Sequence, residues 1–224
     1  TAKYTTGAVS FMDLYSLVTG LIGQNGRRGA LMLSISCEHP DLEDFIEIKS
    51  DLDRITKANI SVRITDKFME AVKNDEKFIL SFTREESGET ITKEINAKEM
   101  FRKLCEMNWD YAEPGILFWD RISNYNLLSN DPNFSYAGTN PCAEEPLPAG
   151  GSCLLGSINL AEFVVDEKFD FESFEGAVHH AVIALNEVLD EGLPLHPLQE
   201  QKDSVRDWRQ IGLGIFGLAD MLIK

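Results

Sequence analysis

Apolar residues recur along the chain in two rhythms, that of helices and that of short strands. Residues 8–22 and 97–112 carry the broad apolar stripe of an amphipathic helix, and residues 171–192 predict a long helix. Alternating, β-branched or short apolar runs predict strands or, for the last run, a strand or loop: 30–36, 59–64, 78–83, 90–95, 116–119 and 154–160. Because helices and strands alternate along the chain, the predicted fold class is α/β.

The pattern also carries finer expectations about where elements begin, end and lie. Asp66 is expected to cap a helix that runs to about Asn74, because a short acidic side chain can accept hydrogen bonds from the first turn. A final helix is expected to begin near Gln201 and to break around residues 212–214. The helix at 8–22 is apolar over a broad face, so we expect it to be nearly buried, in the core or at a dimer interface.

Composition narrows the classes of function. The chain of 224 residues is 43% apolar and 26% charged, as in ordinary globular proteins. Its 21 basic and 37 acidic residues give a net charge of −16, which argues against binding of duplex nucleic acid by bulk charge. The sequence has neither a signal peptide nor an apolar run of about 18 residues, so it predicts no membrane span.

Cysteine usage and the two ends of the chain add two expectations. Four cysteines without short regular spacing do not form a disulfide framework, and they suit free thiols in a reducing cytoplasm. Cys105 lies on the helix at 97–112 and is expected to be a small buried apolar group. The chain opens with Thr1, and residues 212–224 stay apolar to the end, so we expect a piece of a longer protein, incomplete at both ends.

Residues 23–30 are the first stretch with candidate chemistry. Three glycines and two arginines in this loop can bring backbone close to a ligand. Arginine forks suit phosphate or carboxylate groups, so the loop is a candidate for nucleotide contact. Many flexible loops share this composition, and the loop alone does not decide the matter.

The second stretch runs from Asn140 to Cys153 and reads N-P-C-A-E-E-P-L-P-A-G-G-S-C. Its three prolines and its pair of glycines exclude a helix, so we expect a shaped loop. If the segment is extended, Asn140, Cys142 and Glu144 project to the same side, which gathers an amide, a sulfur and a potential base. A turn-rich connection with a buried cysteine fits the spacing equally well.

Several separated segments together resemble the large catalytic subunit of ribonucleotide reductases, in that family's order and over nearly the whole chain. They are G-A-V-S-F-M-D-L-Y, G-R-R-G-A-L-M, H-P-D-L-E-D-F-I, N-I-S-V, N-P-C-A-E, G-S-C-L-L-G-S-I-N-L and I-G-L-G-I-F-G-L-A-D. The sequence around Cys142 is most similar to that of the adenosylcobalamin-dependent branch, class II. A class I catalytic subunit, which takes its radical from a separate metal-containing subunit, is the alternative.

The resemblance implies a fold and a role for individual residues. The fold would be part of a ten-stranded α/β barrel, with Cys142 at the tip of a central finger loop and able to become a thiyl radical. Asn140 and Glu144 match the catalytic amide and carboxylate, and Cys153 matches one of two reducing cysteines. The loop that adjusts to the base being reduced and relays the identity of the effector would be Gln24, Asn25, Gly26, Arg27, Arg28, Gly29 and Ala30.

Cofactors and partners follow from the same resemblance. It implies adenosylcobalamin if class II, nucleoside triphosphate effectors, a ribonucleoside di- or triphosphate substrate, a thioredoxin-like reductant and a homodimer of the full-length enzyme. The second reducing cysteine would precede Thr1, and the phosphate-binding segment would follow Lys224. Residues 1–224 are therefore expected to be inactive as an isolated fragment.

Two other classes of function stay open at this point. One is a nucleotide-binding module that does no chemistry. The other is a cysteine hydrolase with Cys142 as thiolate nucleophile, which needs a histidine base in contact with the sulfur. The four histidines lie outside any such motif, and His179 and His180 are adjacent on a predicted helix and face different directions, so no metal site is predicted.

Overall fold

The computed structural model describes residues 7–22, 26–27 and 29–224, and it divides into two compact units, residues 1–146 and residues 147–224. Both units mix helices and strands, which confirms the α/β class. The strands of the described residues form one sheet of three strands and four of two strands, and they do not close into a barrel. Within the same described residues, no helix is long and apolar enough to cross a membrane.

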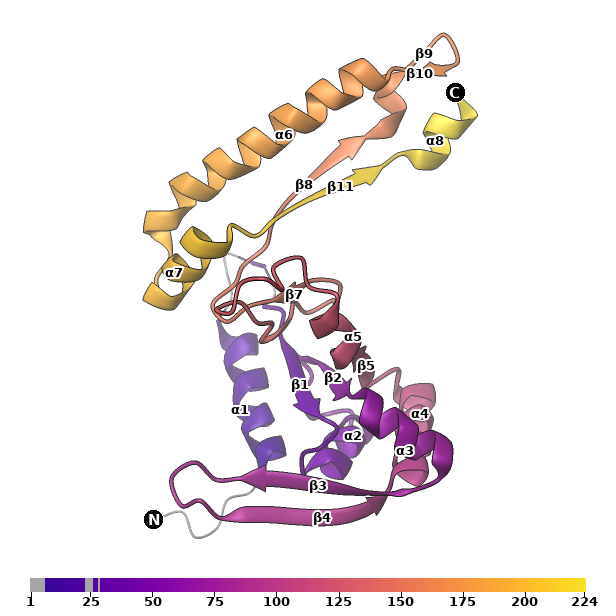
Figure 1. Ribbon diagram of the computed structural model, residues 1–224, viewed down its shortest axis with the longest axis vertical. Helices are drawn as coiled ribbons and strands as arrows, with labels where there is room; N and C mark the ends of the chain where they lie inside the picture. The colour runs from indigo at the N-terminus through magenta and orange to yellow at the C-terminus, as the bar shows by residue number, and fades with distance from the viewer. Residues whose placement is uncertain (1–6, 23–25, 28) are drawn as a thin grey trace. The chain divides into compact units, whose positions relative to one another are not determined.

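The first unit is built on a parallel sheet in the order β1 (Met32–Ser36), β2 (Asn59–Ile64) and β5 (Gly115–Phe118) (Figure 1). The central strand β2 carries the core, because its residues Ile60, Val62 and Ile64 are each only 1% exposed. These three residues alternate with Ser61, which is 4% exposed, and the half-buried Arg63, so one face of β2 lies in the core and the other is largely covered. The pairing of β2 with both neighbours fixes the position of its first residue, Asn59, opposite Met32.

Helical crossovers join these parallel strands, as their direction requires. Between β1 and β2 lie α2 (Leu42–Glu47) and the 3₁₀ turn η1 (Ile48–Ser50). Between β2 and β5 lie α3 (Asp66–Asn74), the antiparallel hairpin of β3 (Lys77–Thr83) and β4 (Thr90–Asn96), and α4 (Ala97–Tyr111). The chain enters this unit through α1 (Ala8–Leu21) and leaves the sheet through α5 (Trp119–Asn124), β6 (Gly138–Thr139) and β7 (Pro146–Leu147).

The helix starts in this unit follow capping chemistry. Thr65, rather than Asp66, caps α3: its Oγ1 accepts a hydrogen bond of 3.2 Å from Phe68 N. Asn96 caps α4 in the same way, with Oδ1 accepting from Glu99 N at 2.9 Å. The expectation for Asp66 was therefore one residue too late, because a threonine hydroxyl at the preceding extended position reaches the amide first.

The structure contradicts one expectation about burial and one half of another. In α1 only Met12 and Ser16 are buried, and large apolar side chains such as Leu17 (59% exposed) and Leu21 (73% exposed) face outward within this chain. Apolar residues lie on most sides of this short helix, and a single contact with the core covers only one side. Burial in the core is therefore wrong for most of the helix, and its position at a dimer interface stays a prediction. Cys105 is exposed on α4, whereas Cys37 at the end of β1 is completely buried.

The second unit contains a parallel pair of strands, β8 (Leu154–Asn159) and β11 (Ile211–Phe216), joined through the long helix α6 (Phe171–Gly192) that runs alongside them (Figure 1). The start of α6 is capped by Asp170 and packed by a cluster of phenylalanine rings: Phe163, Phe169, Phe171 and Phe174. The remaining elements are η2 (Leu160–Phe163), β9 (Val164–Val165), β10 (Lys168–Phe169), η3 (Leu193–Leu195), α7 (Gln199–Trp208) and α8 (Leu218–Ile223).

Strand β11 was not predicted, since residues 212–214 were expected to interrupt a helix. Instead α7 ends at Trp208, and Arg209 takes a left-handed conformation with φ of 45°. Ile211, Leu213 and Ile215 then alternate with other residues along a strand that pairs with β8 in register. The glycines in this segment obscure the period of two, and the strand that pairs with it lies 57 residues earlier in the sequence.

Candidate active site

Asn140 and Glu145 close a tight turn that presents Pro141 and Cys142. Asn140 N donates to Glu145 O at 3.1 Å, and Glu145 N donates back to Asn140 Oδ1 at 3.0 Å. Ala143 N also donates to Asn140 O at 3.0 Å, and Ala143 has a left-handed φ of 68°. The stretch is therefore a loop, as predicted, but the extended geometry with alternating side chains is wrong for it.

The turn nevertheless brings two of the predicted site residues together. Asn140 Nδ2 donates a hydrogen bond of 2.6 Å to Glu144 Oε1. The carboxylate of Glu144 and the thiol of Cys142 are both exposed, while Asn140 is half-buried. An amide, a carboxylate and a thiol thus belong to one five-residue turn, in which hydrogen bonds to the backbone and to Glu144 fix the amide.

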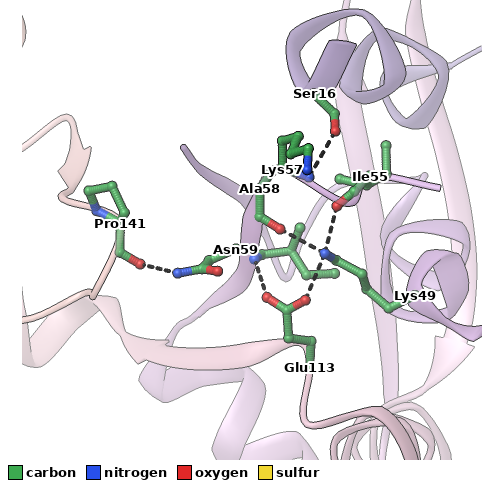
Figure 2. A network of polar contacts seen from close by, with 9 residues as sticks. Ser16, Lys49, Ile55, Lys57, Ala58, Asn59, Glu113 and Pro141 are labelled. Atoms are coloured by element: carbon green, nitrogen blue, oxygen red, sulfur yellow. Dashed lines mark hydrogen bonds and ion pairs between the residues drawn. The ribbon is translucent and has the colours of Figure 1, made fainter. Parts of the chain in front are cut away.

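A second segment of the chain holds this turn from outside. Asn59 Nδ2 donates a hydrogen bond of 2.7 Å to Pro141 O, the carbonyl that directly precedes Cys142 (Figure 2). Asn59 is the first residue of β2, so its side chain is attached at the amino-terminal end of the central strand. The turn is thereby tied to the most deeply buried strand of the unit.

A partly buried ion pair fixes the start of β2. Lys49 Nζ lies 2.8 Å from Glu113 Oε2, and the two side chains are 14% and 23% exposed. Lys49 also donates to the carbonyls of Ile55 and Ala58, each at 2.7 Å, and Glu113 Oε1 accepts from Ile60 N at 3.0 Å (Figure 2). Each charge therefore has several partners, which is what a charge removed from water requires.

Sequence reasoning missed Asn59, Lys49 and Glu113 as neighbours of the site. Asn59 was only the first residue of the predicted strand 59–64 and of the segment N-I-S-V, and Glu113 directly follows the predicted helix 97–112. A glutamate followed by proline and glycine does end a helix, and its second role depends on a strand more than 50 residues earlier. The available signal was weak: an asparagine that opens an otherwise apolar strand.

The four cysteines, all within the described residues, lie in different environments and form no disulfide with one another. Cys142 and Cys105 are exposed. Cys37 Sγ lies 3.6 Å from Thr65 Oγ1, and burial raises the pKa of the Cys37 thiol, so this thiol stays protonated and inaccessible. Cys37 is thus a core residue, and Cys142 is the exposed thiol that sits beside an amide and a carboxylate.

Cys153 lies in the second unit, where it is half-buried and directly precedes β8. The chain before it bends at Gly150, which has a positive φ of 67°. A Cβ added at Gly150 would lie 2.7 Å from the carbonyl oxygen of Glu200, so only glycine fits. The segment that leads to Cys153 is therefore packed closely on the start of α7.

The predicted substrate-specificity loop is described in part. Gln24, Asn25 and Arg28 lie outside the described residues. Gly26, Arg27, Gly29 and Ala30 are exposed. A Cβ added at Gly29 would lie 2.7 Å from Thr19 O, so the backbone at Gly29 passes close to the last turns of α1. Gly29 is thus seated on α1, and the role of the loop in binding stays a prediction.

The first unit supplies no histidine base for a Cys142 nucleophile. His39 is the one histidine among residues 1–146. Its ring packs against Phe82 with centroids 5.1 Å apart, and its Nδ1 accepts from Asp41 N at 3.0 Å. This imidazole is therefore engaged in local structure and is not the base of a Cys142 nucleophile.

Comparison with known proteins finds a matching family model and several relatives. A family model described as "Ribonucleotide reductase, barrel domain" matches residues 1–224. A vitamin B12-dependent ribonucleoside-diphosphate reductase of Thermoplasma acidophilum is 38% identical over 227 residues, covering 100% of this chain and 29% of that protein. The protein of the same description from Mycobacterium tuberculosis H37Rv is 34% identical over 224 residues, covering 99% of this chain and 31% of its own.

A more distant relative carries a different description. A ribonucleoside-diphosphate reductase subunit alpha of Chlamydia pneumoniae is 27% identical over 252 residues, covering 97% of this chain and 24% of its own. The chain spans less than a third of the length of each of these relatives.

Proposed function

Because the chain belongs to the ribonucleotide reductase family, we propose that it carries the radical-bearing part of an enzyme that reduces ribonucleotides to deoxyribonucleotides. Relatives described as vitamin B12-dependent, which match at up to 38% identity, support the class II branch. The descriptions of all three relatives reported above name ribonucleoside diphosphates, and these are the substrates we propose first, with triphosphates as the alternative.

One observation carries the proposal: a single turn exposes the thiol of Cys142 and joins Asn140 to Glu144 by a hydrogen bond of 2.6 Å. Loss of the 2′-hydroxyl of ribose by a polar route is difficult, because carbon 2′ does not readily carry charge. A radical at carbon 3′ permits that loss as water. The chemistry therefore requires a hydrogen abstractor, a base and a group that orients the ribose, and this turn offers one of each.

In the proposed reaction Cys142, as a thiyl radical, removes the hydrogen atom from carbon 3′ and becomes a thiol. Glu144 takes the proton of the 3′-hydroxyl, and Asn140 orients the ribose through a hydrogen bond. The 2′-hydroxyl is protonated and leaves as water. Two thiols, that of Cys153 and that of a partner cysteine, supply two electrons and two protons and end as a disulfide: one proton leaves in the water, and the other hydrogen goes to carbon 2′. Glu144 then returns its proton to the 3′ oxygen, and Cys142 returns its hydrogen atom to carbon 3′ and is again a thiyl radical.

Adenosylcobalamin is the cofactor we propose, and it would supply the radical equivalent that oxidises Cys142. One feature of the chain fits such a group. The Cys142 thiol is exposed, so a cofactor held by other parts of the full-length protein can reach the sulfur. We assign no residue of this chain to binding the cofactor itself.

The wider architecture belongs to the same proposal. Residues 1–224 would form part of a ten-stranded barrel domain incomplete at both ends, with residues 140–145 as its finger loop. Loop residues 24–30 would read the substrate base under the control of nucleoside triphosphate effectors, and the exposed apolar side chains of α1 would lie in a homodimer. A thioredoxin-like protein would restore the cysteines in the cytoplasm, and the isolated fragment would be inactive.

The deciding experiment uses the full-length protein that contains this chain. We expect it to reduce ribonucleoside diphosphates with added adenosylcobalamin and without a second subunit. Cys142→Ala should abolish the reaction, and Cys105→Ala, which removes the other exposed thiol, should leave it unchanged. Strict dependence on another protein subunit would move the assignment to class I, and full activity of Cys142→Ala would favour a binding module without catalysis.

A further inference from the structure

The hydrogen bond between Asn59 and Pro141 joins two segments 82 residues apart in the sequence. We propose that Asn59 is a positioning residue for Cys142: its side-chain amide fixes the peptide on which the thiol is presented. This inference rests on the proposed function, since it assigns Asn59 a part in the reduction. Asn59 itself would touch neither the substrate nor the reacting atoms.

The contact acts at the point where it controls Cys142 most directly. The carbonyl of Pro141 belongs to the peptide bond that links Pro141 to Cys142. The proline ring already fixes φ of Pro141, so the direction of this carbonyl sets the remaining torsion and hence the plane that carries Cys142. A donor at 2.7 Å from the carbonyl oxygen therefore selects one orientation of the thiol-bearing residue.

The donor itself starts from a fixed position. Asn59 N donates to Leu31 O at 2.8 Å within the sheet. On one side of Asn59, the carbonyl of Ala58 accepts from Lys49, and on the other side the amide of Ile60 donates to Glu113 (Figure 2). The Lys49–Glu113 ion pair therefore holds the backbone before and after Asn59, and only the side-chain torsions of Asn59 remain to be set.

The turn needs such an external contact. Among the hydrogen bonds of the described residues, the others made by residues 140–145 stay within the turn, between Asn140 and Ala143, Glu144 or Glu145. These bonds define the shape of the turn but not its orientation on the sheet. Asn59 supplies the link between the two.

Asn59 is also exposed, so a role in positioning Cys142 can be tested apart from any role in core packing. Removing its amide creates no cavity, and the exposed hydrogen bond contributes little to the stability of the fold. A change in catalysis without a change in folding is therefore the expected signature. Asn59→Asp keeps the size of the side chain but removes the N–H donor and places a negative charge opposite the Pro141 carbonyl.

The test has two independent readouts on the full-length protein. The first is steady-state reduction of a ribonucleoside diphosphate with adenosylcobalamin. For Asn59→Asp we expect kcat to fall about tenfold or more, with KM changed less than about twofold, because a misplaced reacting group slows the chemical step. The second readout needs no activity: the rate of iodoacetamide alkylation of Cys142 relative to Cys105, measured on the tryptic peptides, should change by about twofold or more.

Two further variants complete the design. Asn59→Ala, which adds no charge, should change both readouts in the same direction. Asn186→Asp removes an amide donor from the Val182 carbonyl on α6 and should leave both unchanged. The thermal midpoints of all variants should agree with that of the parent protein.

The outcomes separate the two proposals. If kcat of Asn59→Asp and Asn59→Ala stays within about twofold of the parent, or if the Cys142 to Cys105 alkylation ratio is unchanged, the positioning role is wrong. If the parent protein reduces no ribonucleotide, the proposed function fails, while the alkylation ratio still reports whether Asn59 orients Cys142.

Discussion

The side-chain amide of Asn140 donates to Glu144 Oε1 at 2.6 Å, across a turn whose outer residues include Cys142. One oxygen of the carboxylate is thereby oriented by an amide that the turn itself holds, since Asn140 Oδ1 accepts from Glu145 N. A carboxylate has a second oxygen that can accept further hydrogen bonds or a proton. The arrangement is suited to a base that must keep its direction while it remains accessible.

Glu144→Gln tests this arrangement in the full-length protein. Glutamine can accept the same hydrogen bond from Asn140 through its amide oxygen, so the turn should keep its shape. It cannot take a proton from a ribose hydroxyl, and kcat for ribonucleotide reduction should fall by about 10²–10⁴-fold. The measurement is steady-state turnover at saturating substrate, together with the thermal midpoint, which should not change.

Glu145→Gln is the matched control for that variant. Glu145 closes the turn through its backbone N and O, not through its carboxylate. Its substitution should leave turnover within about twofold of the parent, because the backbone bonds persist. Equal losses in both variants would contradict a specific role for the Glu144 carboxylate and would point to net charge near the turn instead.

Ala143 gives a second prediction, because its φ of 68° lies in the left-handed region. A non-glycine residue there is strained by about 1–2 kcal/mol, and a β-branched residue by more. Ala143→Gly should retain turnover, since glycine adopts this conformation without strain. Ala143→Val should lower kcat at least about tenfold by opening the turn. Ala149→Val, at an exposed alanine of the following segment without positive φ, is the control and should be neutral.

How far the sequence predicts this molecule depends on the range of the interactions. Helix α6 and the strands β2, β3 and β4 follow from local periodicity, and their bounds agree closely with those expected. Strand β11 does not, because its assignment depends on pairing with β8 in a distant segment. Cys105 was misjudged for a related reason: a residue's position on an amphipathic stripe gives its direction, but not how far the neighbouring elements extend to cover it.

In the candidate site, too, contacts between residues close in the sequence could be predicted and contacts between distant residues could not. Asn140, Cys142 and Glu144 are close in sequence, so their grouping could be predicted although the turn geometry could not. Asn59 and Glu113 approach them only through the sheet, across separations of 82 residues to Pro141 and 53 residues between Glu113 and Ile60. No local pattern encodes such contacts, because register between strands is set by the packing of the whole unit.

The Lys49–Glu113 pair provides a third prediction. Each charge is largely buried and has backbone partners, so removing one charge leaves the other without its counterpart. Lys49→Met and Glu113→Gln should each destabilise the start of β2 by about 1–3 kcal/mol. Amide hydrogen exchange in peptides that cover residues 55–62 of the full-length protein measures this loss. The double variant should lose less than the sum of the two, because the second change removes a charge that is already unpaired; strict additivity would show that the two residues act independently.

The ion pairs of Glu43 predict a response to acid in the first unit. Hydrogen bonds from Lys103 and then Lys93 lower the pKa of Glu43 to about 2, and these contacts tie α2 to α4 and to the hairpin strand β4. Since the folded state has the lower pKa, the stabilisation is complete above the unfolded value of about 4.3 and is lost as the pH falls toward 2. The carboxylate is partly exposed, so the contribution is about 1 kcal/mol.

Hydrogen exchange of residues 90–96, corrected for the intrinsic rate, should therefore become faster between pH 5 and pH 2.5 in the parent protein and change much less in Glu43→Gln. Glu94→Gln, whose partner Lys77 is 75% exposed, should behave as the parent does, and an unchanged response in Glu43→Gln would assign the acid sensitivity to other carboxylates.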